Sequence, residues 1–144
     1  MKTLILFVLF SGALLFTATA WNRSQVAPDT GIRFTNGSWD EIRAKARKEK
    51  KIIFLDVSAS WCGPCKMLKR NTFSDIEVGE YFNAHFINVA LDGENGEGRL
   101  LAKQYGVHGY PTMLFIMPDG SIKNTAVGYH TPKQLLKQAY RVVN

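Results

Sequence analysis

Short apolar runs alternate along the chain with amphipathic stretches, and this alternation predicts the order of strands and helices. The run at 51–57 is apolar and rich in β-branched residues, as in a buried strand. Similar runs at 86–91, 113–117 and 122–127 predict three more strands, and a shorter alternation at 32–34 predicts a first edge strand. A tight turn separates the last two runs, so they should form a hairpin.

Three capping boxes predict where helices begin, because a serine or threonine at the cap is followed three residues later by glutamate or glutamine. The boxes start at Ser38, Ser74 and Thr131 and predict helices that run to about residues 50, 84 and 143. Two further helices are predicted, one after the first long strand and one over 99–105, where Gly106 ends it. Helices therefore follow every strand except the one that enters the final hairpin.

The predicted order is β-α-β-α-β-α-β-β-α, which is an α/β fold. Strands joined through a helix should run parallel, whereas the two strands of the final hairpin should be antiparallel. A central mixed β-sheet flanked by helices on both faces satisfies this order. No internal repeat or low-complexity segment divides the chain, so one folded domain is expected over 32–144.

Residues 1–20 carry the pattern of a secretory signal peptide. Lys2 precedes an apolar stretch that ends in Ala18-Thr19-Ala20, a small-residue cleavage pattern. We expect cleavage after Ala20, a flexible lead-in over 21–31, and export that leaves the protein periplasmic or secreted. An uncleaved segment that anchors the protein in a membrane is the alternative.

The chain carries a formal charge of +6, and its basic residues are spread over many predicted surface positions. Nucleic-acid-binding proteins gather their cations in stripes or patches, so we expect no nucleic-acid partner. Only two cysteines are present, which is too few for a disulfide framework in an exported protein. The cysteine pair is therefore expected to serve chemistry.

Cys62 and Cys65 are separated by two residues, where the first long strand gives way to a helix. At the helix start, Cys62 would meet unpaired N–H groups and the positive end of the helix dipole, which stabilise a thiolate. Pro64 fits the first turn, where its missing N–H costs little. The alternatives are a short structural disulfide and half of a zinc site. No metal is expected. The loop at 92–98 lacks the oxygen ligands of a calcium site. A zinc site would need a second pair of ligands, and none is formed by His85, His108 and His130.

The sequence Trp61-Cys62-Gly63-Pro64-Cys65 resembles the active site of the thioredoxin family, and the resemblance extends over roughly 32–144. It implies the thioredoxin fold, thiol–disulfide oxidoreductase activity through a Cys62–Cys65 redox disulfide, and no metal or organic cofactor. The sequence Thr72-Phe73-Ser74-Asp75, with the helix that follows, looks closer to secreted thioredoxin-like domains related to the C-terminal domain of the thiol:disulfide interchange protein DsbD.

The family's motifs imply roles for further residues. Asp56 matches a buried carboxylate that helps to deprotonate the resolving cysteine, and an apolar strand would raise its pKa. A water-exposed aspartate at the strand end is the alternative. Pro111 matches the family's cis-proline, with a trans loop proline as the alternative, and the Tyr110 backbone beside it would pair with an extended substrate. A glycine near the end of the last strand would let partner backbone approach. The expected substrate-binding residues are Trp61, Gly63, Pro64, Tyr110, Pro111 and Gly128.

Two positions depart from the family's pattern. Ser58 stands where many thioredoxins carry a tryptophan, and Asn88 stands where they often carry a lysine near the buried aspartate. Without that cation, Asp56 is expected to lose a charged partner. These departures argue against a general cytosolic thioredoxin.

We expect an exposed Cys62 to attack a protein disulfide and a more buried Cys65 to resolve the mixed disulfide, with help from Asp56. The expected partners are protein disulfides and an upstream thiol reductant, such as a membrane protein, and the chain is expected to be a monomer. The leading function is protein-disulfide reductase outside the cytoplasm. The alternatives are an oxidase or isomerase of secreted proteins, and a binding module without redox activity.

Overall fold

The computed structural model describes residues 30–144. The predicted signal peptide (1–20) and nearly all of the predicted lead-in (21–31) lie outside the described residues. Among the helices of 30–144, none has both the length and the apolar character needed to cross a membrane.

Within this region the chain forms four strands, five α-helices and one π-helical segment. They follow one another as α1 (Trp39–Glu49), β1 (Ile52–Ser58), α2 (Gly63–Leu68), η1 (Lys69–Phe73), α3 (Ile76–His85), β2 (Phe86–Asp92), α4 (Gly96–Gln104), β3 (Thr112–Ile116), β4 (Ile122–Val127) and α5 (Pro132–Val143).

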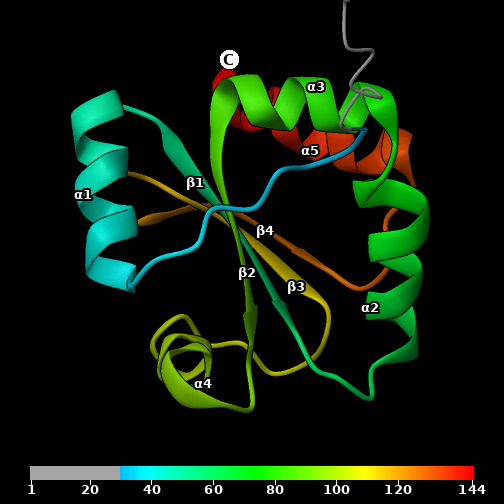
Figure 1. Cartoon of the computed structure of the whole chain (residues 1–144), viewed down its shortest axis with the longest axis horizontal. Helices are drawn as coiled ribbons and strands as arrows, with labels where there is room; N and C mark the ends of the chain where they lie inside the picture. The colour runs from blue at the N-terminus through cyan, green and yellow to red at the C-terminus, as the bar shows by residue number, and fades with distance from the viewer. Residues whose placement is uncertain (1–29) are drawn as a thin grey trace, which may run out of the picture.

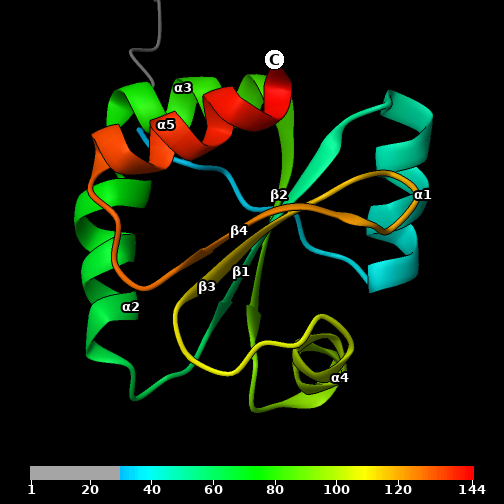
Figure 2. The same ribbon diagram turned by 180° about the vertical axis from the view of Figure 1, so that it is seen from behind.

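The four strands form one mixed sheet in the order β2-β1-β3-β4. Strand β1 pairs in parallel with β2, from Ile52 opposite Phe86 onward, and antiparallel with β3. Strands β3 and β4 form the expected antiparallel hairpin. Helices α1 and α4 cover one face of the sheet, whereas α2, α3 and α5 cover the other (Figures 1 and 2). The predicted fold class, a mixed sheet flanked by helices on both faces, is confirmed.

Strand β1 divides the core into two clusters, because successive side chains of a strand point to opposite faces. Phe54 packs in the cluster beneath α3 and α5, where several aromatic rings meet edge to face. Ile53, Leu55 and Val57 pack in the cluster beneath α1 and α4. Both faces of β1 are therefore buried, as its nearly continuous apolar sequence predicted.

The predicted first edge strand at 32–34 is wrong, because that segment forms no strand. Its backbone bonds go to different elements: the N–H of Ile32 donates to the carbonyl of Phe73 in η1, and the N–H of Arg33 donates to the side chain of Asn83 in α3. Just beyond the segment, the N–H of Thr35 donates to the carbonyl of Asn88 in β2. A strand needs a ladder with one neighbour. The alternation of apolar residues that suggested a strand instead packs Ile32 and Phe34 against the core.

The second predicted helix start is displaced by one residue. Capping boxes form as expected at Ser38 and Thr131, but α3 is capped by Asp75, whose carboxylate accepts a hydrogen bond from the N–H of Val78 at 3.0 Å. An N-cap residue needs extended backbone, which Asp75 has (φ −67°, ψ 137°). Ser74 has helical backbone (φ −84°, ψ −7°) because it ends η1, and its hydroxyl donates to the carbonyl of Arg70.

Helix α3 packs closely on the start of the described chain at a glycine. A Cβ atom on Gly79 would lie 2.5 Å from the Cα of Gly31, inside the distance that real contacts allow. The absence of a side chain at Gly79 therefore sets how near α3 can approach this segment.

We expect Gly79→Ala to lower the free energy of unfolding by about 1–3 kcal/mol through overpacking. The clash should outweigh the gain of about 1 kcal/mol that alanine brings to a helix interior. Urea denaturation measures the change. Glu80→Ala on the exposed face of the same helix is the control and should stay within about 0.5 kcal/mol. A stabilised Gly79→Ala variant would contradict the close approach.

Candidate active site

Three segments converge at one edge of the sheet. Parallel strands β1 and β2 end there, at Ser58 and Asp92, and antiparallel β3 begins there at Thr112. The turn into α2, the loop into α4 and the segment before β3 therefore lie side by side (Figures 1 and 2). In open α/β sheets, ligands usually bind at the carboxyl ends of the parallel strands.

The two cysteines are joined by a disulfide at this edge, with an S–S distance of 2.06 Å. Cys62 is the N-cap residue of α2, and its sulfur accepts a hydrogen bond from the N–H of Cys65 at 3.1 Å. Pro64 occupies the first turn of α2, where a proline disturbs no helical bond. The sulfur of Cys62 therefore lies at a helix N-terminus, where a negative charge is favoured.

The expected exposure of Cys62 is wrong for this disulfide form, because Cys62 and Cys65 are each only 2% exposed. The two residues pack with Ala59, and Tyr110 lies against the cluster. Accessibility therefore does not distinguish the two sulfurs. Their positions on α2 do, since Cys62 caps the helix and Cys65 lies within its first turn.

Asp56 is 1% exposed, which rules out the alternative of a water-exposed aspartate. It lies inside β1, two residues before the strand ends, on the same face as Phe54. Neither of its carboxylate oxygens accepts a hydrogen bond from the described residues. Burial raises the pKa of Asp56 to about 7, while the charge of Lys69 acts to lower it. This carboxyl group therefore changes its charge near neutral pH.

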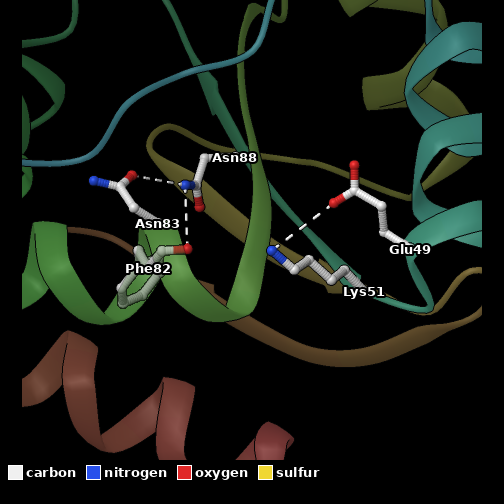
Figure 3. Close-up of polar contacts among 5 residues, drawn as sticks. All are labelled: Glu49, Lys51, Phe82, Asn83 and Asn88. Atoms are coloured by element: carbon white, nitrogen blue, oxygen red, sulfur yellow. Dashed lines mark hydrogen bonds and ion pairs between the residues drawn. The ribbon is translucent and has the colours of Figure 1, made fainter.

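Asn88 does not face Asp56. In the parallel register of β1 and β2, Asn88 lies opposite Phe54, whereas Asp56 lies opposite Ala90. The side-chain amide of Asn88 donates to the carbonyl of Phe82 and to the side chain of Asn83, both at 3.3 Å (Figure 3). Asn88 therefore ties β2 to α3. Figure 3 also shows the exposed ion pair at the start of β1, between Lys51 and Glu49.

As expected, Asp56 has no ion-pair partner among the described residues, and the charge of Lys69 in η1 acts on it only from beyond contact distance. Lys69 and Ala90 help to line a surface cleft of about 470 Å³, and Ala90 is the β2 neighbour of Asp56. Lys69 was not among the residues predicted from the sequence. The available signal was its spacing seven residues after Cys62, which places both on one side of a continuous helix.

The cis peptide bond between Tyr110 and Pro111 lies directly before β3. The N–H of Gly128 donates to the carbonyl of Pro111 at 2.8 Å, so the end of β4 adjoins this segment. Gly128 has a left-handed φ of +84°, which favours glycine, and a Cβ there would meet nothing within 4 Å. The Tyr110 ring packs edge-on against Trp61, with ring centroids 6.1 Å apart.

The structure thus brings Trp61, Tyr110, Pro111 and Gly128 to the edge that holds the disulfide. Gly63 faces open space, since a Cβ on it would meet nothing within 4 Å. Glu94, which the sequence did not predict as a site residue, accepts a hydrogen bond from the indole N–H of Trp61 at 3.0 Å. The signal for Glu94 was an acidic loop directly after a strand that ends at this edge. Within residues 30–144, no three His, Cys, Asp or Glu side chains gather as a metal site would require.

Comparison with known proteins gives consistent matches. The Thioredoxin-like family model matches residues 33–118. Thioredoxin H4 of Arabidopsis thaliana is 35% identical over 94 residues, which cover 65% of this chain and 74% of that protein. The thiol:disulfide interchange protein DsbD of Pseudomonas fluorescens is 35% identical over 77 residues, 53% of this chain but only 13% of that protein. The match to DsbD therefore concerns one small part of a much longer protein.

Solved structures agree. A candidate disulphide-isomerase from Bacteroides thetaiotaomicron is 44% identical, with a TM-score of 0.69 over 81% of this chain and 97% of that one. A thioredoxin from Thermus thermophilus, 23% identical, has a TM-score of 0.70 over 79% of this chain and 88% of that one. The oxidised C-terminal domain of DsbD from Neisseria meningitidis, 22% identical, has a TM-score of 0.61 over 71% and 90%. At these identities, the last two show the shared fold alone.

We expect Asp56→Asn to remove a pH dependence of stability. Because the pKa of Asp56 is raised from 3.8 to about 7 on folding, the folded protein holds this proton more tightly. This tighter binding of the proton adds to the free energy of unfolding, and its contribution is fully present below about pH 4. The contribution is lost as the pH rises to about 7, and the total loss is about 4 kcal/mol. The variant should therefore be more stable than the parent at pH 8.5, by a few kcal/mol, and should differ least below pH 4.

Urea denaturation across this pH range measures the difference between the two proteins. Glu80→Gln, which neutralises an exposed carboxylate on α3, is the control and should leave the pH dependence of the parent unchanged. A constant difference between Asp56→Asn and the parent from pH 4 to pH 8.5 would contradict the raised pKa of Asp56.

Proposed function

The chain belongs to the thioredoxin-like family of thiol–disulfide oxidoreductases, and from this premise we propose that it reduces protein disulfides outside the cytoplasm through Cys62 and Cys65. The observation that carries the proposal is a Cys62–Cys65 disulfide at the N-terminus of α2, on the strand-to-helix connection that follows the buried Asp56. A nucleophile stabilised by a helix end and a nearby proton acceptor are the two parts that dithiol chemistry needs.

Reduction begins with the dithiol form. The Cys62 thiolate attacks one sulfur of the substrate disulfide, and the other substrate sulfur leaves as a thiolate that takes a proton. Cys65 then loses its proton and attacks the sulfur of Cys62. The second substrate thiol is released, and the Cys62–Cys65 disulfide remains. Two electrons have passed from the protein to the substrate, so a thiol reductant must restore the dithiol.

Asp56 is proposed to take the proton of Cys65. A general base works best when its pKa lies near the working pH, and burial brings the pKa of Asp56 to about 7. The group can then accept a proton from Cys65 and lose it again near neutral pH.

The substrate is proposed to lie across the surface formed by Trp61, Gly63, Pro64, Tyr110, Pro111 and Gly128. Trp61 is 66% exposed and offers apolar contact area. An extended substrate segment could pair with the backbone at Tyr110, in the manner of an added strand. The open space beside Gly63 and Gly128 leaves room for the partner's backbone.

The proposed location rests on the N-terminal sequence, with its cation, apolar stretch and small-residue cleavage pattern. An oxidising compartment would drain a reductant, so the upstream thiol donor must lie within reach there, and a membrane protein could carry electrons across. We propose that the chain works as a monomer on protein substrates, without nucleic acid, metal or organic cofactor.

A second candidate function is disulfide isomerase or oxidase. The observation that favours it is the 44% identity to a candidate disulphide-isomerase. The same two cysteines would act, but the mixed disulfide would resolve into a rearranged or newly formed substrate disulfide. A third possibility, binding without redox activity, has less support because such a protein would not need both thiols.

We expect Cys62→Ser to abolish catalysis of insulin reduction by dithiothreitol, because the attacking thiolate is lost. Cys65→Ser should retain the first step and accumulate a mixed disulfide, which non-reducing electrophoresis detects. Glu80→Gln is the control and should behave as the parent. Trapping by Cys62→Ser in place of Cys65→Ser would reverse the two roles, and a parent without catalysis would contradict the proposed function.

We expect the disulfide to have a reduction potential nearer to that of thioredoxin, about −270 mV, than to that of DsbA, about −120 mV. Gly63 and Pro64 place no cationic side chain between the sulfurs, so the thiolate depends mainly on the helix end. Equilibration with glutathione, followed by thiol alkylation, measures the potential. A value near that of DsbA would favour the oxidase and leave the roles of the two cysteines unchanged.

A further inference from the structure

The loop between β2 and α4 forms one wall of the candidate active site. The N–H of Gly93 donates to the carbonyl of Ser58, the last residue of β1, at 2.8 Å. A Cβ on Gly93 would lie 2.6 Å from a ring carbon of Tyr110. The loop backbone therefore contacts the Tyr110 ring with no room for a side chain, and the next residue, Glu94, lies at the rim.

Glu94 is held in place by its neighbours. Its backbone N–H donates to the carboxylate of Asp92 at 2.9 Å, and its carbonyl accepts from the guanidinium of Arg99 at 2.7 Å. Its side chain accepts from the indole N–H of Trp61 at 3.0 Å. Both side chains are nevertheless at the surface, so the Glu94 carboxylate is fixed beside Trp61 and still open to a ligand.

This wall is acidic although the chain as a whole carries a formal charge of +6. The ion pair found among residues 30–144 lies elsewhere, between Lys51 and Glu49. Arg99 donates to the backbone carbonyl of Glu94, and the Glu94 carboxylate forms no ion pair with a described residue. The pKa of the Tyr110 hydroxyl is raised first by burial and then by the charges of Glu94 and Asp92, with Arg99 opposing. The negative field therefore reaches the residue that lies against the disulfide.

A neutral acceptor would suffice to hold the indole of Trp61, so the hydrogen bond alone does not account for the charge. A carboxylate fixed at the rim of a binding surface attracts cations and repels anions on an incoming partner. Such rim charges act mainly on encounter and on the choice of partner.

We propose that Glu94 determines substrate specificity, by favouring protein disulfides that carry a lysine or arginine beside the cysteine, while its hydrogen bond positions Trp61. The inference rests on the proposed reductase function and names its substrate class. The chemical step is unchanged, since the substrate disulfide gains two electrons from the Cys62–Cys65 dithiol, and dithiothreitol restores the dithiol in the experiment.

Three short peptides with one intramolecular disulfide test the proposal, with lysine, glutamine or glutamate next to one cysteine. The parent protein should reduce the lysine peptide with a kcat/KM about three- to tenfold above that of the glutamate peptide at low ionic strength. The ratio should shrink as salt rises past about 0.15 M, because the charges are exposed.

Glu94→Gln separates charge from hydrogen bonding, because the glutamine side chain can still accept from the Trp61 indole. The ratio between the lysine and glutamate peptides should fall to about 1, while the indole N–H resonance of Trp61 keeps its chemical shift. Glu94→Ala should also bring the ratio to about 1, and it should change the chemical shift of the Trp61 indole N–H. Glu80→Gln makes the same charge change on α3, at the opposite end of the sheet (Figure 1), and should keep the ratio.

Equal rates on all three peptides, or an unchanged ratio in Glu94→Gln, would overturn the specificity role and leave the proposed reductase function standing. If Glu80→Gln lowered the ratio between the lysine and glutamate peptides as much as Glu94→Gln does, the specificity role would also be overturned. The preference would then follow the net charge of the protein. Failure of the parent to reduce any of the three peptides would overturn the reductase function and this inference together.

Discussion

Burial of β1 on both faces is the constraint on which the rest of the structure depends. The strand lies between β2 and β3, and its side chains alternate between two core clusters. This alternation directs Asp56 into an interior where it finds no hydrogen-bond partner among the described residues. The same strand ends at Ser58 and leads into the turn that carries Cys62 to the cap of α2. One apolar strand thus sets the positions of both Asp56 and the sulfurs.

A buried carboxyl without partners is unfavourable when it is charged, and the proton transfer proposed for Asp56 depends on this property. Hydrogen bonds to the carboxylate would lower the pKa of Asp56 and leave it a weaker base at neutral pH. Lys69 moderates the effect of burial from η1 without removing it. The site therefore holds a group that lowers stability above neutral pH, and the general-base role proposed for Asp56 calls for a pKa near 7.

Patterns within short stretches of sequence correctly predicted most of the features that depend on neighbouring residues. The apolar run before Cys62, the capping boxes at Ser38 and Thr131 and the final hairpin all formed as expected. The displaced cap at Asp75 is a local failure, but others concern contacts between distant segments. Residues 32–34 alternate like a strand, but their backbone N–H groups bond η1 and α3 in place of a neighbouring strand. The hydrogen bond from Trp61 to Glu94 joins residues 33 positions apart, and no periodicity in the sequence encodes it.

The acidic wall has consequences for reactivity as well as for recognition. A negative charge close to the sulfurs disfavours the thiolate that the end of α2 stabilises. The charges of Glu94 and Asp92 act on Tyr110, which packs against the cysteines. If they also reach the sulfurs, the specificity proposed for Glu94 implies that they oppose the activation of Cys62 until a cation on the substrate offsets them. A substrate that brings such a cation would both bind better and restore the thiolate at the moment of attack. Selectivity and activation would then have one origin, and a neutral substrate would meet a less reactive nucleophile.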